Sequence, residues 1–304
     1  MNKVIHAPLT NVLLFSLFWA LEIFTAKLAF LDGAKVMPFS LQSFVIALLF
    51  IAIVTLPKKL HKLFSIPFSV LKWVLLASAI LLGIGGFLGN VGIQMTTAIN
   101  AGFLTQVTTV TTALFAWMIL KEKVTKTKIV LIGVILLGTF LLVTNGTGLV
   151  PHIGDIFIIL ACFAWGFGPV LIKKMINHES VDPDIASLLR PAAGIPVLLI
   201  FVALAPLYPP ELQKVFNVNI FEVSQGHYVI LNGIFIALTW LFVNRTLKVA
   251  SASYTALLGS ITPILVAILA VTFLRETITS IQFIGILLIL TASYLIEHMQ
   301  FHKH

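Results

Sequence analysis

Apolar runs long enough to cross a lipid bilayer recur along the whole sequence. Each is about 19–24 residues long, and about 20 apolar residues in a helix cross the hydrocarbon core. The strands of a membrane barrel would instead alternate apolar and polar residues over roughly ten positions. We therefore predict an all-α integral membrane protein with ten transmembrane helices. The runs occupy residues 10–30, 38–56, 71–93, 98–120, 127–145, 153–176, 185–207, 226–246, 252–274 and 280–298.

The composition excludes the main soluble classes. Only 10% of the 304 residues are charged, whereas a soluble domain carries about 25%. This is too few for a soluble enzyme, a nucleic-acid-binding protein or a disordered chain. The first apolar run has no small-residue cleavage site and is too long for a signal peptide, so we interpret it as a retained span. The chain has 1 cysteine, Cys162, which cannot form an internal disulfide.

The positions of the basic residues predict the orientation. With a cytoplasmic N-terminus, most of the 19 Lys and Arg residues lie in cytoplasmic loops or at cytoplasmic helix ends. Arg190 lies within a span, and the opposite side keeps only Lys27, Lys35, Lys214 and Arg275. Positive charge favours the cytoplasmic side. We therefore expect a multi-pass protein of the bacterial inner membrane with both termini in the cytoplasm.

The sequence contains an internal repeat. With an offset of 154 residues, the segment 90–125 matches the segment 244–279, and LKEKVT falls on LRETIT. With an offset of 146, Trp19 falls on Trp165 and Lys27 falls on Lys173. We predict two halves of five spans each, residues 1–148 and 149–304. Because five is odd, the second half must begin on the opposite side of the membrane, and such inverted repeats are typical of secondary transporters.

The two matching segments resemble a known family. The second copy reads SASYTALLGSITPILVAILAVTFLRETITSIQFIGILLIL and carries Tyr254, Pro263, Glu276 and Gly285. This pattern, with Trp and Lys in the first span of each half, resembles the EamA-type transporters of the drug/metabolite transporter superfamily. The first copy is looser, with Asn100 in place of Tyr254. The resemblance implies a ten-helix carrier of a small organic metabolite such as an amino acid, with export as the expected direction.

Glu22 is the main candidate for transport chemistry. It lies inside the first apolar run, where a charge is costly unless it is paired, hydrated or neutralised. Trp19 lies three residues earlier, on the same face of a helix. A carboxylate beside an indole suits an organic cation or amine, and Glu22 is also our candidate for proton coupling. The alternative is a structural ion pair between Glu22 and Arg190.

Further polar and aromatic residues are candidates for substrate binding. Arg190 can bind a carboxylate through two parallel hydrogen bonds, or its side chain can reach to the membrane interface. The amides can line a cavity or join helices to one another. The aromatic residues can form a wall of the site or an interface belt. We interpret Lys27 and Lys173 as interface anchors, with binding of an anionic substrate as the alternative. These candidates are Asn90, Gln94, Trp165, Arg190, Asn244 and Tyr254.

Other functions have less support in the sequence. There is no P-loop, so we expect no ATPase in the chain, and the residue patterns predict no metal site and no cofactor. The expected partners are a small metabolite, the bilayer and a second copy of the chain in a homodimer, with no nucleic acid. The alternative is a non-transporting scaffold or an intramembrane enzyme. A polar cavity at mid-membrane would favour a carrier, and a solid core would favour a scaffold.

Overall fold

The structure is a computed structural model that describes residues 7–96, 101–102, 104–144, 146–147, 152–179, 181–207, 213, 222, 226–274 and 278–301. These residues form helices and connecting segments, with no strand among them. The elements are α2 (Ala7–Leu31), α3 (Val36–Phe64), α4 (Phe68–Ser78), η1 (Ala79–Gly86), α5 (Phe87–Met95), α7 (Val107–Leu120), α8 (Lys126–Thr144), α9 (Ile153–His178), α10 (Pro183–Leu204), η2 (Ala205–Leu207), α12 (Gly226–Val249), α13 (Ala252–Leu258), η3 (Gly259–Ile261), α14 (Thr262–Leu274) and α15 (Ser280–Phe301).

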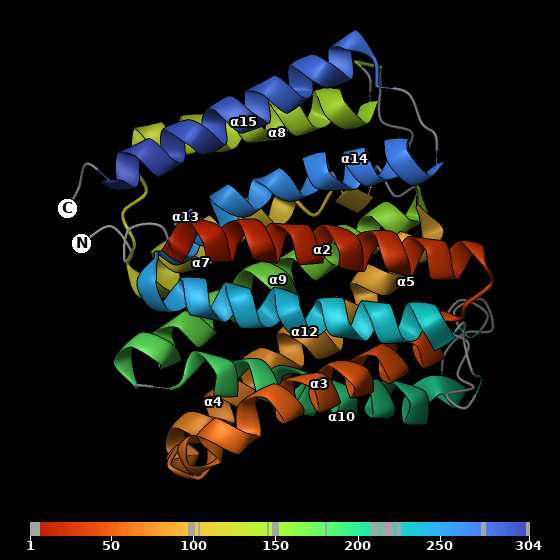
Figure 1. The fold of residues 1–304 in the computed structure, drawn as a ribbon, viewed down its shortest axis with the longest axis vertical. Coiled ribbons are helices and arrows are strands. Elements are labelled where there is room, and N and C mark those ends of the chain that lie inside the picture. Colours follow the sequence, from red (N-terminus) through yellow and green to blue (C-terminus); the bar gives the residue numbers. More distant parts are fainter. Residues whose placement is uncertain are drawn as a thin grey trace.

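Each predicted span overlaps one helical segment of the described chain, which confirms the all-α fold. Seven of these segments are long and apolar enough to cross a membrane, and two shorter apolar helices, α7 and residues 280–295 of α15, accompany them. In Figure 1 the helices run roughly side by side, and α2 begins on the face of the bundle where α15 ends. An even number of crossings requires this arrangement.

Three of the spans are not regular α-helices. The third span passes from α4 through η1, a π-helical segment, into α5. The ninth span has a 3-10 turn, η3, between α13 and α14. In the fourth span a turn at Thr105 and Gln106 precedes α7, and the 154-residue offset places this turn on η3. Irregular backbone inside a membrane needs protein or water around it, and discontinuous helices often form the binding site of a transporter.

The helices of the two halves interlock. The first helix of the first half, α2, packs along α12 of the second half, and α9 packs along α5 in the corresponding way. The helices α3 and α10 lie against each other, as do α8 and α15 at one end of the bundle (Figure 1). A Cβ added to Gly138 would lie 2.8 Å from the carbonyl oxygen of Gly285. The core therefore forms between the halves rather than within each of them.

The repeat-related lysines bind helix ends. Lys27 Nζ donates to the carbonyls of Ile93 (3.3 Å) and Thr96 (2.6 Å), at the C-terminus of α5. Lys173 Nζ donates to Leu247 (2.8 Å) and Ala250 (2.6 Å), at the C-terminus of α12. Both pairs of carbonyls are related by the 154-residue offset. Both lysines therefore bind the exposed carbonyls of a helix C-terminus, where a cation is favourable, and their placement at the interface stays a prediction.

Glu122 completes the junction that Lys173 holds. Its carboxylate accepts hydrogen bonds from the backbone N–H of Ala252 (2.9 Å) and from the Ser253 hydroxyl (2.7 Å), at the start of α13. A carboxylate is favourable at a helix N-terminus. Lys173 thus binds the C-terminus of α12 and Glu122 binds the N-terminus of α13, at the point where the two helices follow one another. The matching Glu276 lies outside the described residues.

Candidate functional site

A cavity lies in the middle of the bundle, between the two halves. The volume inside it that water-sized molecules can occupy is about 60 Å³. It reaches towards the junction of α12 and α13, on the face where α2 begins. The lining comes from both halves: Phe15, Trp19, Glu22, Leu82, Gly86, Thr105, Gln106, Thr108, Thr109, Thr112, Trp165, Pro169, Thr239, Trp240, Val243, Leu247, Ala252, Thr255, Ala256 and Gly259.

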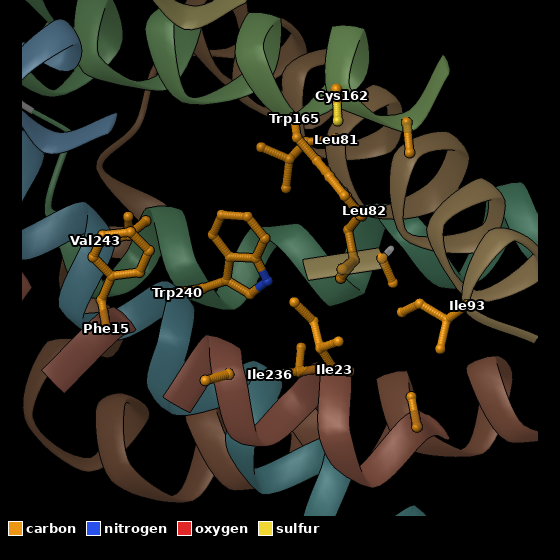
Figure 2. Packing of buried hydrophobic residues seen from close by; sticks show 14 of the residues in the cluster. Phe15, Ile23, Leu81, Leu82, Ile93, Cys162, Trp165, Ile236, Trp240 and Val243 are labelled. Atoms are coloured by element: carbon orange, nitrogen blue, oxygen red, sulfur yellow. The ribbon is translucent and has the colours of Figure 1, made fainter. Parts of the chain in front are cut away.

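Aromatic rings form much of the wall. Trp19 stacks on Phe15 with the ring centroids 5.9 Å apart, and it meets Trp165 edge to face at 6.1 Å. Figure 2 shows the side chains of Trp165, Trp240 and Leu82 within one cluster of buried residues. Trp165 fits there because a Cβ on Gly89 would overlap its ring. The glycines of the third span therefore make room for an indole, in addition to bringing helices close together.

Glu22 lines the cavity with a carboxylate that forms no ion pair among the described residues. Its Oε2 is buried and has no hydrogen-bond partner among the described residues, and the Thr239 side chain lies beside it. Its backbone carbonyl accepts a hydrogen bond from Asn232 Nδ2 (2.8 Å), which joins α2 to α12. No ion pair between Glu22 and Arg190 forms. The contact between α2 and α12 at this point therefore uses the backbone of Glu22 and leaves its Oε2 without a partner.

A stripe of threonines was missed by the sequence analysis. Thr105, Thr108, Thr109 and Thr112 all line the cavity, and their spacing of three and four residues is that of one helix face. Gln106 lies among them, and its Oε1 is buried without a partner. The signal was present in the sequence as LTQVTTVTT, because hydroxyls repeated at helical spacing in an apolar run mark a polar face.

The two repeat-related asparagines join helices. Asn90 Nδ2 donates to Ser40 Oγ (2.8 Å), and Asn244 Nδ2 donates to Ser187 Oγ (2.8 Å). Each serine is the fifth residue of its helix, α3 or α10. Neither asparagine is among the residues that line the cavity. The same bond therefore fastens the second helix of each half to the third.

Arg190 lies behind the cavity wall. It is fully buried, donates to Asn244 Oδ1 and stacks on Trp240 with its Cζ 4.0 Å from the ring centroid. Trp240 lines the cavity, whereas Arg190 does not. Gln94 on α5 and the buried Tyr254 on α13 also lie outside the lining. Of the predicted site residues, the structure brings together Trp19, Glu22 and Trp165.

Charged residues cluster at one end of the bundle, where α3 ends and α10 begins. Lys59 forms ion pairs with Asp182 and Asp184, both at 2.8 Å, and Lys62 reaches Asp182 at 2.7 Å. Arg245 of α12 pairs with Asp184 at 2.8 Å. Burial alone would raise the pKa of Asp182, but hydrogen bonds from Lys59 and Lys62 lower it to about 2. The pairs of Lys59 and Lys62 link the first half to the second, and the Arg245 pair lies within the second half.

Comparison with known proteins identifies the chain. The EamA-like transporter family matches it twice, over residues 8–144 and 152–297. The chain belongs to the EamA-like transporter family. It is therefore an integral multi-pass membrane protein of a transporter family, as the sequence predicted. The boundary between residues 148 and 149 stays a prediction.

Individual relatives agree with this assignment. The transporter is 30% identical over 229 residues to an "Uncharacterized transporter" of Archaeoglobus fulgidus, covering 71% of this chain and 67% of the relative. A solved structure described only as "Crystal structure of protein" superposes with a TM-score of 0.70 and 16% identity, over 94% of this chain and 93% of the other. The second similarity supports the fold alone.

The described part of the transporter contains no group of three or more His, Cys, Asp or Glu side chains placed to hold a metal ion. The polar side-chain groups of the lining residues are hydroxyls, one amide, three indole N–H groups and one carboxylate. A largely apolar, aromatic lining with a few polar groups is typical of small-molecule sites.

Proposed function

We propose that this transporter is a secondary carrier that exports a small organic solute by alternating access, with Glu22 as the group that binds a proton or the amine of the solute. The observation that carries the proposal is the Glu22 carboxylate in a cavity walled by Trp19 and Trp165: it has no ion-pair partner among the described residues, and its buried Oε2 has no hydrogen-bond partner there. A buried charge without a partner in the protein is costly, so a mobile cation or a proton is its natural complement.

The architecture supports alternation. Trp19 and Trp165 belong to opposite halves and meet at the cavity, so a rocking motion of one half against the other would open the wall between them. The cavity reaches towards the face where both described chain ends lie. The bias of Lys and Arg supports a cytoplasmic location for that face, and a solute taken up from the cytoplasm would then be exported.

A scaffold or an intramembrane enzyme fits the cavity less well. A scaffold has no need for an internal cavity with unpaired polar atoms, each of which costs stability. An enzyme needs a nucleophile or base oriented by a third group. We therefore retain the carrier. Formation of a homodimer stays a prediction.

The test is transport by purified protein in proteoliposomes. Uptake of labelled L-leucine, L-phenylalanine and putrescine is measured between pH 5.5 and pH 8.5. We expect Glu22→Gln to flatten the dependence of uptake on pH, because the amide cannot take up a proton. The matched control is Glu179→Gln, a change at an exposed carboxylate. An unchanged pH profile in Glu22→Gln would contradict the coupling role.

A further inference from the structure

Arg190 is a buried cation whose binding capacity is largely unused. A guanidinium has five N–H donors, and the hydrogen bond to Asn244 uses only its Nη2. The Nε and Nη1 atoms are buried without partners. None of the ion pairs between described residues involves Arg190. Burial of an unpaired charge is costly, so the site is incomplete without an anionic group.

A comparison of the two halves distinguishes the structural role of the contact between asparagine and serine from any role of Arg190. In the second half, Asn244 holds Ser187, and Arg190 is the eighth residue of α10. In the first half Asn90 holds Ser40 in the same way, but the eighth residue of α3 is Ser43. The fold therefore forms this helix contact without an arginine. Arg190 is therefore present in the second half only. Glu22 is likewise present in the first half only, because its counterpart in the second half is Gly168.

Trp240 stands between Arg190 and the cavity. Its indole lines the cavity and has the guanidinium 4.0 Å from its centroid. The indole N–H has no partner among the described residues, so no hydrogen bond of that group has to break if the ring turns. In Figure 2 the ring projects from α12 into the cluster of buried residues. A rotation of this one side chain would connect the guanidinium with the cavity.

The geometry points to Arg190 as the binding site for a carboxylate group of the transported solute, screened by Trp240 until the solute enters. This inference rests on the proposed carrier function. The planar fork of a guanidinium matches a carboxylate through two parallel N–H···O bonds. With Glu22 available for a cationic group in the same cavity, the solute class is a small zwitterion with an apolar body.

Three probes of one carbon skeleton separate the two charges. L-Leucine carries both groups, isopentylamine lacks the carboxylate, and 4-methylpentanoate lacks the amine. The shift in melting temperature of the detergent-purified protein is measured against probe concentration. If Glu22 were the only charged group at the site, it would repel the carboxylate of L-leucine and of 4-methylpentanoate. For the wild type we therefore expect both probes to bind more tightly than such a site would allow. In Arg190→Gln their affinity should fall about 10- to 100-fold, the equivalent of one or two charge-assisted hydrogen bonds. The affinity for isopentylamine should not fall.

Control variants keep the result interpretable. Arg190→Lys keeps the charge without the fork, so it should restore only part of the affinity for the carboxylate probes. Arg245→Gln removes an arginine outside the cavity and should leave the ranking of the probes unchanged. Trp240→Phe removes one tryptophan, so the difference between its emission and that of the wild type shows the contribution of Trp240. We expect 4-methylpentanoate to change the tryptophan emission of the wild type but to have much less effect in Trp240→Phe.

Two results would overturn the assignment. One is an equal response of the wild type to all three probes, including no response to any. The other is an undiminished preference for carboxylate in Arg190→Gln. Because binding is measured without a membrane gradient, it does not depend on transport. Counterflow of labelled L-leucine in proteoliposomes tests the carrier function separately, so a failure of the Arg190 assignment is distinguished from a failure of the carrier function.

Discussion

Trp19 and Trp165 occupy equivalent positions in the two halves and meet edge to face, with their ring centroids 6.1 Å apart. Each indole projects from the first helix of its own half, α2 or α9. A contact between equivalent residues lies near the axis that relates the halves. The wall of the cavity is therefore formed at the place where relative movement of the halves changes its shape.

Gly89→Ala should displace Trp165 and destabilise the protein. The added Cβ would overlap the indole, and such overpacking costs about 1–3 kcal/mol. The melting temperature in detergent should fall, and so should uptake into proteoliposomes. The matched control is Gly133→Ala in α8, where a Cβ meets nothing within 4 Å. A melting temperature equal to that of the wild type would show that the ring has room to move.

Lys173→Met should weaken the junction between α12 and α13. The substitution keeps an unbranched side chain but removes the charged donor to Leu247 and Ala250. Hydrogen bonds from a charged group contribute about 1.5–3 kcal/mol, so we expect a loss of unfolding free energy of about that size in denaturant titrations. Lys174→Met, at the exposed neighbour, is the control. Equal effects of the two changes would argue against the helix-end role.

Asp182→Asn should lower the melting temperature at pH 7 by several degrees. The pKa of Asp182 in the folded protein, about 2, lies below the ordinary value of 3.8. The ion pairs with Lys59 and Lys62 therefore stabilise the fold above about pH 4, and this contribution is lost as the pH falls towards 2. The difference between wild type and variant should shrink over the same interval. A difference that is constant down to pH 3 would contradict this account, and Glu179→Gln serves as the exposed control.

Both chain ends should report the same side of the membrane. Fusions of a fluorescent protein and of a periplasmic phosphatase to the N-terminus and to the C-terminus distinguish the cytoplasm from the periplasm. We expect fluorescence and an absence of phosphatase activity at both ends, because basic residues are concentrated on that side. Opposite results at the two ends would exclude ten crossings.

Patterns within short segments of the sequence predicted the helices and the repeat. The ten apolar runs fix the helices, because a backbone in hydrocarbon must satisfy its hydrogen bonds within the segment. The matching of Trp19 with Trp165 and of Lys27 with Lys173 predicted two related halves. The role of the lysines could not be predicted in the same way, because their acceptors lie 66 to 77 residues away in the sequence.

The sequence by itself determined a helical membrane protein with a duplicated plan and an acidic residue in its first span, since hydrophobicity and repetition are properties of short segments. Only the tertiary structure decided that Glu22 faces a cavity without a partner, that Arg190 lies behind Trp240, and that Asn90 and Asn244 hold helices together. These outcomes depend on which side chains from distant helices meet. Which side chains meet is set by the packing of whole helices and by the space that glycines leave. The spacing of residues along one helix does not predict these contacts.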